Sequence, residues 1–223
     1  MCGRYSITTP VEGMQRAFAF PERPNLKPRY NLTPTQDAPI VRLGEDGRRH
    51  LASLRWGLIP SWAKEASIGS KMINARSETL AEKPSFRGPL KSRRCLVPAD
   101  GFYEWMKSDG AKQPYRIGLA DGGVFAFAGL WDRWAPAGQD AIESFTIITT
   151  AADELLRPIH DRMPVMLDPA AHDLWLTAPP REALAALDAR IRPRAMTAYR
   201  VGTRINSPRN DDPACIEPLT AAG

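Results

Sequence analysis

Cys2 directly follows the initiator methionine, and no other residue in the chain offers chemistry as unusual. A side chain this small generally permits removal of Met1, which would leave a thiol and an α-amine on one residue. Their reference pKa values are about 8.5 and about 7.7–8.0, so both groups have a nucleophilic fraction near neutral pH. An aldehyde is their natural target, because the amine can form a Schiff base that the thiol then closes into a five-membered thiazolidine. Position two alone is weak support for this chemistry, so other residues must decide.

The segment INARSETL, residues 73–80, places Asn74 and Arg76 two positions apart. In an extended chain the amide and the guanidinium point to the same side, where they could bind a phosphate or a sugar. The same residues could instead begin a helix, with Asn74 or Ser77 as its cap and Arg76 in solvent. The sequence leaves both interpretations open.

Glu104 lies between aromatic residues in the strand-like segment DGFYEW. Alternation along a strand puts Phe102, Glu104 and Met106 on one face. If that face is inward, burial raises the pKa of Glu104 towards neutrality, as a general acid or base requires. If Tyr103 and Trp105 face inward instead, Glu104 is an ordinary surface carboxylate, and the sequence does not choose between the two.

His160 belongs to the segment RPIHDRMP, between Pro158 and Pro164. Two prolines so close together exclude a helix interior, so we expect a loop in which the imidazole could shuttle protons. The other histidines have more ordinary settings. His50 falls in a predicted hairpin and His172 in a predicted helix, which indicates structural roles.

Composition indicates one globular domain, residues 1–223, with its own hydrophobic core. Hydrophobic residues make up 43% of the chain and charged residues 25%. The net charge of +5 suits a polyanionic partner but does not identify one, since no run of five basic residues occurs. Cys2, Cys95 and Cys215 are far apart, so we expect neither disulfides nor a metal site, and no cofactor. Without a leader or membrane span, a cytoplasmic protein is expected.

The elements that must position these residues are mostly short strands. A strand at 3–7 precedes a helix with Thr9 as N-cap, Pro10 as first residue and Glu12 completing a capping box. The proline-rich segment 21–36 is expected to be a loop. We expect a hairpin of strands 38–43 and 50–56, further strands around Cys95 and at 102–106, 115–119, 124–131 and 144–150, and helices at 168–175 and 181–190.

This pattern predicts an α+β fold: a single compact β-rich domain with an antiparallel sheet or barrel at its centre and peripheral helices. The 21 prolines argue against long βαβ repeats. The ordered motifs MCGRY, YNLTPTQ, RWGLIPSW, INARSET, DGFYEW and IHDRMP resemble the SOS-response-associated peptidase family, the SRAP domain. Similarity in NSPRN and IEP, residues 206–210 and 216–218, extends the resemblance over nearly the whole chain.

The resemblance implies a protein that binds single-stranded DNA and captures the aldehyde of an abasic site as a thiazolidine. Cys2 would be the nucleophile, Asn74 would orient it and the sugar, Glu104 would act as acid or base, and His160 would assist Schiff-base formation and reversal. Further implied DNA contacts are Arg76 and Arg162 to phosphates, and a path lined by Arg4, Asn31, Pro34, Trp62, Phe86, Trp105 and Thr149.

We expect a monomer in the cytoplasm, associated with the nucleoid. The chain departs from the family pattern before Phe86, where an arginine is often found; Lys83 or Arg87 could replace it. The segment AKEASIGSK after Trp62 is longer and more polar than expected, so the edge of the groove is expected to differ.

Two rival functions remain open on the sequence alone. In an N-terminal-nucleophile amidohydrolase or peptidase, the α-amine of Cys2 would serve as base for the thiol. In a non-covalent single-strand-binding module, aromatic residues beside basic ones, such as Trp62 near Lys64, would bind unpaired bases and phosphates. Trp131 and Trp175 are expected to pack in the core instead.

Overall fold

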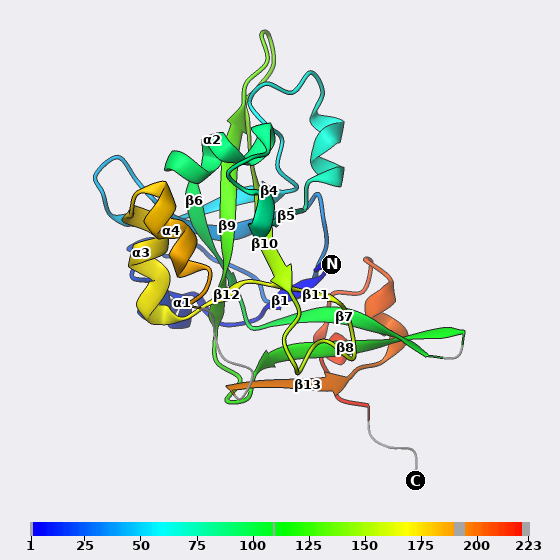
Figure 1. Cartoon of the computed structure of the whole chain (residues 1–223). Coiled ribbons are helices and arrows are strands. Elements are labelled where there is room, and N and C mark those ends of the chain that lie inside the picture. The colour runs from blue at the N-terminus through cyan, green and yellow to red at the C-terminus, as the bar shows by residue number, and fades with distance from the viewer. Residues whose placement is uncertain (1, 109, 190–194, 220–223) are drawn as a thin grey trace.

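Two β-sheets form the centre of the protein in the computed structural model, which describes residues 2–108, 110–189 and 195–219. The larger sheet closes on itself, because β10 pairs with both β4 and β9, and β4, β3, β6 and β9 are joined in that order. The β-rich α+β class with a barrel at its centre is confirmed (Figure 1). The strands of this sheet are β3 (Asp37–Leu43), β4 (Arg49–Trp56), β5 (Asn74–Arg76), β6 (Arg94–Ala99), β9 (Phe125–Trp134), β10 (Ile142–Ala151), β11 (Arg162–Pro164) and β12 (Met166–Leu167).

The barrel is not purely antiparallel, which corrects one of the alternatives above. β10 runs parallel to β4, with Ser144 opposite Arg55, and parallel to β5, with Ile147 opposite Asn74. A parallel pair needs a long connection, and here the chain between β4 and β10 forms β5, β6 and β9 of this sheet, and two strands of a second sheet, before it returns. The hairpin of β3 and β4 and the strands around β6 to β10 lie where the sequence predicted them.

The second sheet has the order β13-β8-β7-β1-β2 and lies across one end of the barrel (Figure 1). Its strands are β1 (Tyr5–Ile7), β2 (Arg29–Leu32), β7 (Gly101–Ser108), β8 (Ala111–Leu119) and β13 (Met196–Arg200). The expectation that residues 21–36 form only a loop is wrong at β2. This strand is only four residues long within proline-rich sequence, and its pairing with β1 rather than any local pattern makes it a strand.

Aromatic side chains join the two sheets next to β1. The ring of Tyr5 lies edge-on to Trp56 of β4, with centroids 5.1 Å apart, and to Phe127 of β9 at 5.9 Å. Phe102 of β7 meets the same Phe127 at 5.8 Å. Such edge-to-face pairs contribute roughly 0.5–1.5 kcal/mol each beyond the area they bury. They anchor β1 between the sheets, and so fix the position of the cysteine that precedes it.

Helices surround the barrel. α1 (Val11–Phe18), α3 (His172–Thr177) and α4 (Pro180–Ala186) gather on one side of it, and α2 (Pro84–Ser92) lies apart from them (Figure 1). Asp168 accepts a hydrogen bond from the Ala170 amide at 3.0 Å and begins the short 3₁₀ turn before α3, as predicted. The helix expected at 181–190 is confirmed in its first part as α4, and residue 190 lies outside the described residues. None of the described helices is long and apolar enough to cross a membrane.

The start of α1 differs from the predicted capping box. Pro10, not Thr9, is the N-cap residue, and no side chain caps the helix. The amide and hydroxyl of Thr9 instead donate to the buried carboxylate of Asp100, at 3.0 and 3.3 Å. The charged Asp100 carboxylate binds Thr9 in place of a capping interaction with the helix, because hydrogen bonds to an ionised acceptor are stronger than those to a neutral one.

Candidate active site around Cys2

Cys2 is completely buried where the chain enters β1. Its thiol lies 3.9 Å from the carbonyl oxygen of Arg4. Burial raises the pKa of the thiol far above its ordinary range, and the negative charge of Glu104 adds to the effect. The thiol is therefore protonated at neutral pH, and any reaction that uses its sulfur needs a nearby group to accept the proton.

Asn74 contacts Cys2 directly. Its side-chain amide donates a hydrogen bond to the Cys2 carbonyl oxygen at 2.8 Å. The pairing of β5 with β10 fixes its backbone, and the indole of Trp56 donates to the carbonyl of the preceding Ile73 at 3.0 Å. The side-chain oxygen of Asn74 is buried and accepts no hydrogen bond from the described residues. A buried acceptor without a hydrogen bond costs folding free energy, so this oxygen is suited to accept a hydrogen bond from a donor on a bound molecule.

The extended interpretation of the INARSETL segment holds for its backbone, whereas neither Asn74 nor Ser77 caps the short turn that follows. Residues Asn74–Arg76 are extended, and Ser77–Thr79 then form one 3₁₀ turn. Arg76 is exposed at the end of β5.

Glu104 is only 2% exposed in the middle of β7. Phe102, on the same face of β7 as Glu104, and Tyr103, on the opposite face, are both fully buried. Both faces of the strand are therefore covered by other parts of the protein here. Burial raises the pKa of Glu104, and the charge of His160 opposes part of this rise. A carboxyl group with a raised pKa gives and takes its proton at a higher pH than an ordinary carboxyl group, which suits it to act as a general acid or base.

His160 lies in a turn before β11, as expected. The amide of Arg162 donates to its Nδ1 at 3.0 Å, and the Asp161 carboxylate lies 2.8 Å from the same nitrogen. His160 and Glu104 line one pocket of about 370 Å³, together with Trp105, Lys107, Lys112 and Asn206. Cys2, Asn74, Glu104 and His160, from four separate segments, are thus connected by a hydrogen bond, electrostatic coupling and a shared pocket.

The two other histidines do not line this pocket. His50 on β4 pairs with Glu22 at 2.6 Å and with Asp46 at 3.1 Å. His172 is buried in α3 against Phe18, with ring centroids 5.7 Å apart. Within the described ranges, no cluster of three or more His, Cys, Asp or Glu side chains could hold a metal ion.

Arg4, which is half-buried, and Asn31, which is fully buried, hold the C-terminal segment in place. Arg4 donates to the side-chain oxygen of Asn31 at 2.9 Å and to the Ile205 carbonyl at 2.5 Å. Asn31 is fully buried and donates to the carbonyls of Ser207 and Asn210 at 3.0 and 2.6 Å. Both residues therefore tie β1 and β2 to the segment that carries Asn206.

Arg162 is engaged by a residue that sequence reasoning missed. Its guanidinium meets the Glu78 carboxylate in a bidentate pair, at 2.6 and 3.0 Å, and also donates to the Thr149 carbonyl at 2.8 Å. This pairing lowers the pKa of Glu78 to about 2. Thr149 itself is fully buried. Glu78 belongs to the INARSET motif, but its partner lies on β11, far along the chain, so only the fold reveals the pair.

The remaining expected DNA contacts differ in exposure. Trp62 is 57% exposed and lines a hollow of about 620 Å³ with Lys64 and Lys71. Trp105 is half-buried, and its indole donates to the Asn206 side chain at 2.7 Å. Pro34 is half-buried. Phe86, by contrast, is only 6% exposed within the core beneath α2, so little of its ring could meet DNA, whereas Lys83 and Arg87 beside it are exposed.

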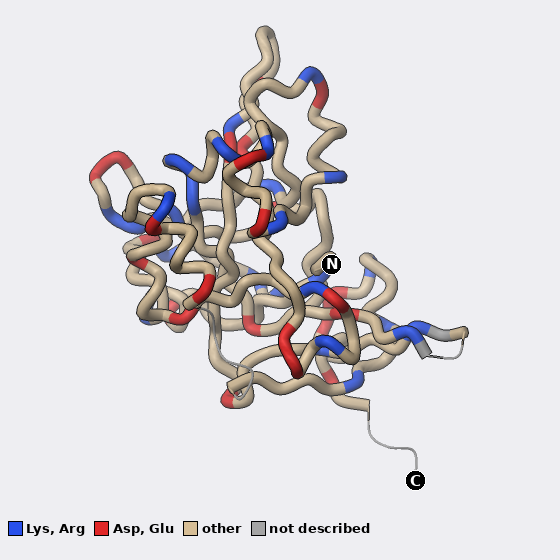
Figure 2. The backbone as a smooth tube through the Cα atoms, viewed as in Figure 1, with Lys and Arg blue, Asp and Glu red and all other residues tan. Residues whose placement is uncertain are grey.

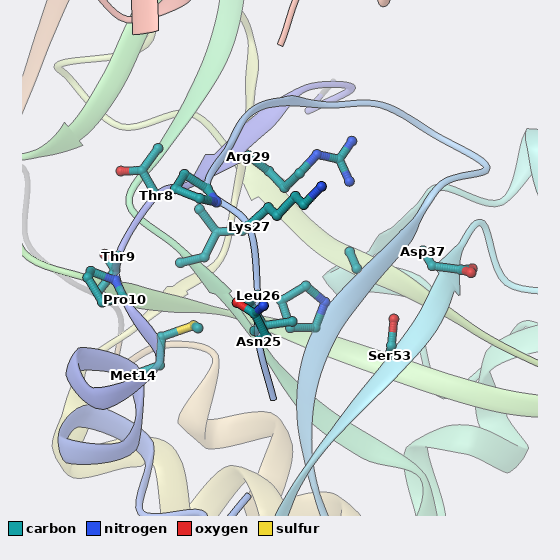
Figure 3. A pocket seen from close by; sticks show the side chains of 14 residues that line it. Thr8, Thr9, Pro10, Met14, Asn25, Leu26, Lys27, Arg29, Asp37 and Ser53 are labelled. Atoms are coloured by element: carbon teal, nitrogen blue, oxygen red, sulfur yellow. The ribbon is translucent and has the colours of Figure 1, made fainter. Parts of the chain in front are cut away.

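A second cavity of about 360 Å³ lies at the other end of β1, where Thr8 and Thr9 lead into α1 (Figure 3). The segment Asn25–Arg29 and strands β3 and β4 close it, with Lys27 and Arg29 on one side and Met14 on another (Figure 3). Its lining includes neither a cysteine nor a histidine. The pocket at Glu104 and His160 is therefore the better candidate for chemistry.

Comparison with known proteins gives a consistent result. Residues 1–208 match the family model described as SOS response associated peptidase (SRAP). The chain is 44% identical over 225 residues to abasic site processing protein YoqW of Bacillus subtilis (strain 168), covering 97% of this chain and 99% of that protein. It is 34% identical over 266 residues to abasic site processing protein HMCES of Gallus gallus, covering 98% of this chain and 78% of that protein.

Solved structures resemble the fold closely. A crystal structure of a protein from Bacteroides thetaiotaomicron aligns with a TM-score of 0.88 at 27% identity, covering 98% of this chain and 100% of that chain. One from Bordetella bronchiseptica aligns with a TM-score of 0.80 at 32% identity, covering 90% of this chain and 100% of that chain.

Proposed function

The chain belongs to the SOS response associated peptidase (SRAP) family, and on this premise we propose that it processes abasic sites in single-stranded DNA by bonding covalently to them through Cys2. The names of the relatives supply the abasic site as the lesion. The observation that carries the covalent chemistry is the convergence of Asn74 and Glu104 on Cys2. The chemistry requires that Met1 be removed, since only then does Cys2 carry a free amine.

The amine of Cys2 reacts first. It adds to the aldehyde carbon of the ring-opened sugar, and the resulting carbinolamine loses water to form a Schiff base. Loss of that water needs a proton donor at the departing oxygen. Glu104, whose pKa is raised by burial, and His160, in the same pocket, are the groups placed to supply it.

The thiol reacts second. Its sulfur bonds to the imine carbon, its proton leaves, and the imine nitrogen gains a proton, so that aldehyde and aminothiol have become a thiazolidine plus one water. Because burial keeps the thiol protonated, Glu104 in its ionised form is the base for this step. The order of steps follows from the thiol's high pKa, which makes it inert until the imine is beside it.

Asn74 orients the nucleophile. Its hydrogen bond to the Cys2 carbonyl fixes the backbone of the reacting residue. Its buried side-chain oxygen accepts no hydrogen bond from the described residues, so a sugar hydroxyl could donate one to it. Arg76, exposed at the end of the same strand, is placed for a phosphate beside the lesion. Trp62 and Trp105 present ring surface on which unpaired bases could stack.

A peptidase in which the Cys2 amine activates the thiol is the second candidate, and the word peptidase in the family's name favours it. The raised pKa of Cys2 argues against it, because an amide is a weak electrophile that needs a thiolate. Turnover of an amide substrate without DNA would support this alternative.

We infer further that residues 1–223 act as one domain and as a monomer in the cytoplasm, at the nucleoid. The bonds of Arg4 to Ile205 and Asn206, near the opposite end of the chain, support a single unit.

The test is a denaturing gel of the protein incubated with an oligonucleotide that carries one abasic site. Intact mass should show loss of Met1, and the adduct should weigh protein plus oligonucleotide minus one water. Cys2→Ala should give no adduct. Cys95→Ala, which removes an equally buried thiol from the barrel wall, should react like the wild type. An undiminished adduct with Cys2→Ala, or none with the wild type, would refute the proposal.

A further inference from the structure

The structure assigns to the β7–β8 hairpin a second phosphate-binding subsite, in which Lys107 and Lys112 hold the backbone of the single strand as it leaves the Cys2 site. This inference rests on the proposed function and adds a path along which the strand leaves the site. Neither lysine belongs to a motif that the sequence analysis used.

The two lysines form a concentrated positive charge. Lys107 on β7 lies directly opposite Lys112 on β8 in the antiparallel register. Like charges in that arrangement repel each other, and natural sheets usually place opposite charges there. Both side chains are exposed, and no carboxylate of the described residues forms an ion pair with either. Figure 2 shows this basic stretch towards the outer end of the hairpin. An anion between the two ammonium groups would relieve the repulsion.

The lysines share a pocket with the candidate catalytic groups. The pocket of about 370 Å³ that Glu104 and His160 line is also lined by Trp105, Lys107 and Lys112. β1 pairs with β7 only as far as Phe102, and the Tyr103 amide still donates to the Arg4 carbonyl at 3.0 Å. Beyond that point the described part of the sheet leaves this edge of β7 without a neighbouring strand. An extended chain can therefore lie along it.

Trp105 lines the same pocket and is held by two contacts. Its indole nitrogen donates to the Asn206 side chain at 2.7 Å, and the Arg4 guanidinium lies 6.0 Å from the ring centroid. A fixed aromatic ring followed by two cations is the arrangement that binds single strands with little regard to sequence, by base stacking and phosphate neutralisation. Lysines that were only solvated surface charges would not be expected to share a pocket with an aromatic ring and with the candidate catalytic groups.

The experiment compares wild type with the double variant Lys107→Gln/Lys112→Gln. The control is Lys27→Gln/Lys91→Gln, which removes two exposed charges outside the pocket. Non-covalent affinity for unmodified single strands is measured over a range of salt concentrations, and adduct formation is measured separately with abasic strands. Both sets of strands are shortened stepwise from the 5′ end or from the 3′ end.

The lysine-pair variant should bind the longest strand on the order of fivefold more weakly, and its salt slope should fall by about 1.4, since each phosphate contact to a single strand contributes about 0.7. This difference should shrink when the strand is shortened from one end only. Equal losses in the control, or a loss that persists at every length, would overturn the subsite. A wild type that binds strands but gives no adduct would instead refute the proposed covalent function, so the two failures are distinguishable.

Discussion

Glu104 is the residue whose protonation the proposed chemistry depends on most. Burial raises its pKa, so it takes up its proton at a higher pH than the ordinary value of about 4.3. As base for the thiol it must be ionised. The thiol-closing step should therefore be fast above the raised pKa and should slow as the pH falls through it.

Glu104→Gln should slow adduct formation and release about 100-fold, within the range that a positioned acid or base contributes. It should also remove the part of the slowing at low pH that the carboxyl group causes, while the part caused by protonation of the Cys2 amine should remain. Rates from quenched time courses between pH 4 and pH 8, with Glu154→Gln as an exposed control, measure both effects. Non-covalent affinity should change little. An unchanged pH profile in Glu104→Gln would mean that another group is the base.

Sequence reasoning at the residue scale could find candidates but not their environment. Glu104 could be identified from its motif, yet alternation could not say which face of β7 is inward, because Phe102 and Tyr103 are both buried in the fold. The family resemblance assigns Arg4 and Asn31 to the DNA path, but no local pattern reveals that the fold also bonds them to backbone carbonyls about 175 residues or more further along the chain.

At the scale of elements, the Glu78–Arg162 pair joins the turn after β5 to β11. It holds an arginine that the family resemblance assigns to a phosphate. A phosphate must therefore either displace the Glu78 carboxylate from Arg162 or bind Arg162 beside it. Removing the carboxylate should raise the affinity for DNA in the first case and lower it in the second.

Glu78→Gln should raise the affinity for single strands severalfold and make the salt slope steeper by about 0.7, because it releases one guanidinium for a phosphate. Fluorescence anisotropy with an unmodified oligonucleotide measures both quantities, and Glu82→Gln, an exposed carboxylate beyond the same turn, is the control. If affinity falls instead, Glu78 positions Arg162 for the phosphate rather than competing with it.

The predicted elements were accurate where the pattern is local and failed where it is not. The β3–β4 hairpin has alternating apolar residues around a glycine-bounded turn, so it could be predicted. β2 has neither length nor alternation, and its partner β1 makes it a strand. The parallel pairing of β10 depends on how the whole barrel closes, which is a property of tertiary packing rather than of any segment.

At the scale of the whole molecule, His172 couples stability to pH. Burial, followed by the charge of Arg49, lowers its pKa to about 4, from an ordinary value of about 6.5. Below pH 6.5 the unfolded chain binds a proton that the folded protein does not. The free energy of unfolding should therefore fall as the pH drops from about 6.5 to about 4, by on the order of 2 kcal/mol from this residue.

Chemical denaturation of wild type and His172→Phe across this range tests the prediction, since the difference between the two curves isolates His172. His50→Gln provides a contrast of opposite sign. Glu22 and Asp46 raise the pKa of His50, so its contribution is present at low pH and is lost as the pH rises. If wild type and His172→Phe lose stability in parallel, His172 is not the titrating group.

The burial of Cys2 also decides how its sulfur meets oxidants. Peroxide attacks thiolates that solvent can reach, and the first product is a sulfenic acid. Cys2 is buried, and this burial raises the pKa of its thiol, so little of the thiolate that peroxide attacks is present in the folded protein. We therefore expect the low reactivity of the thiol to protect it from peroxide. The sulfur should stay reduced during oxidative stress, between one encounter with DNA and the next.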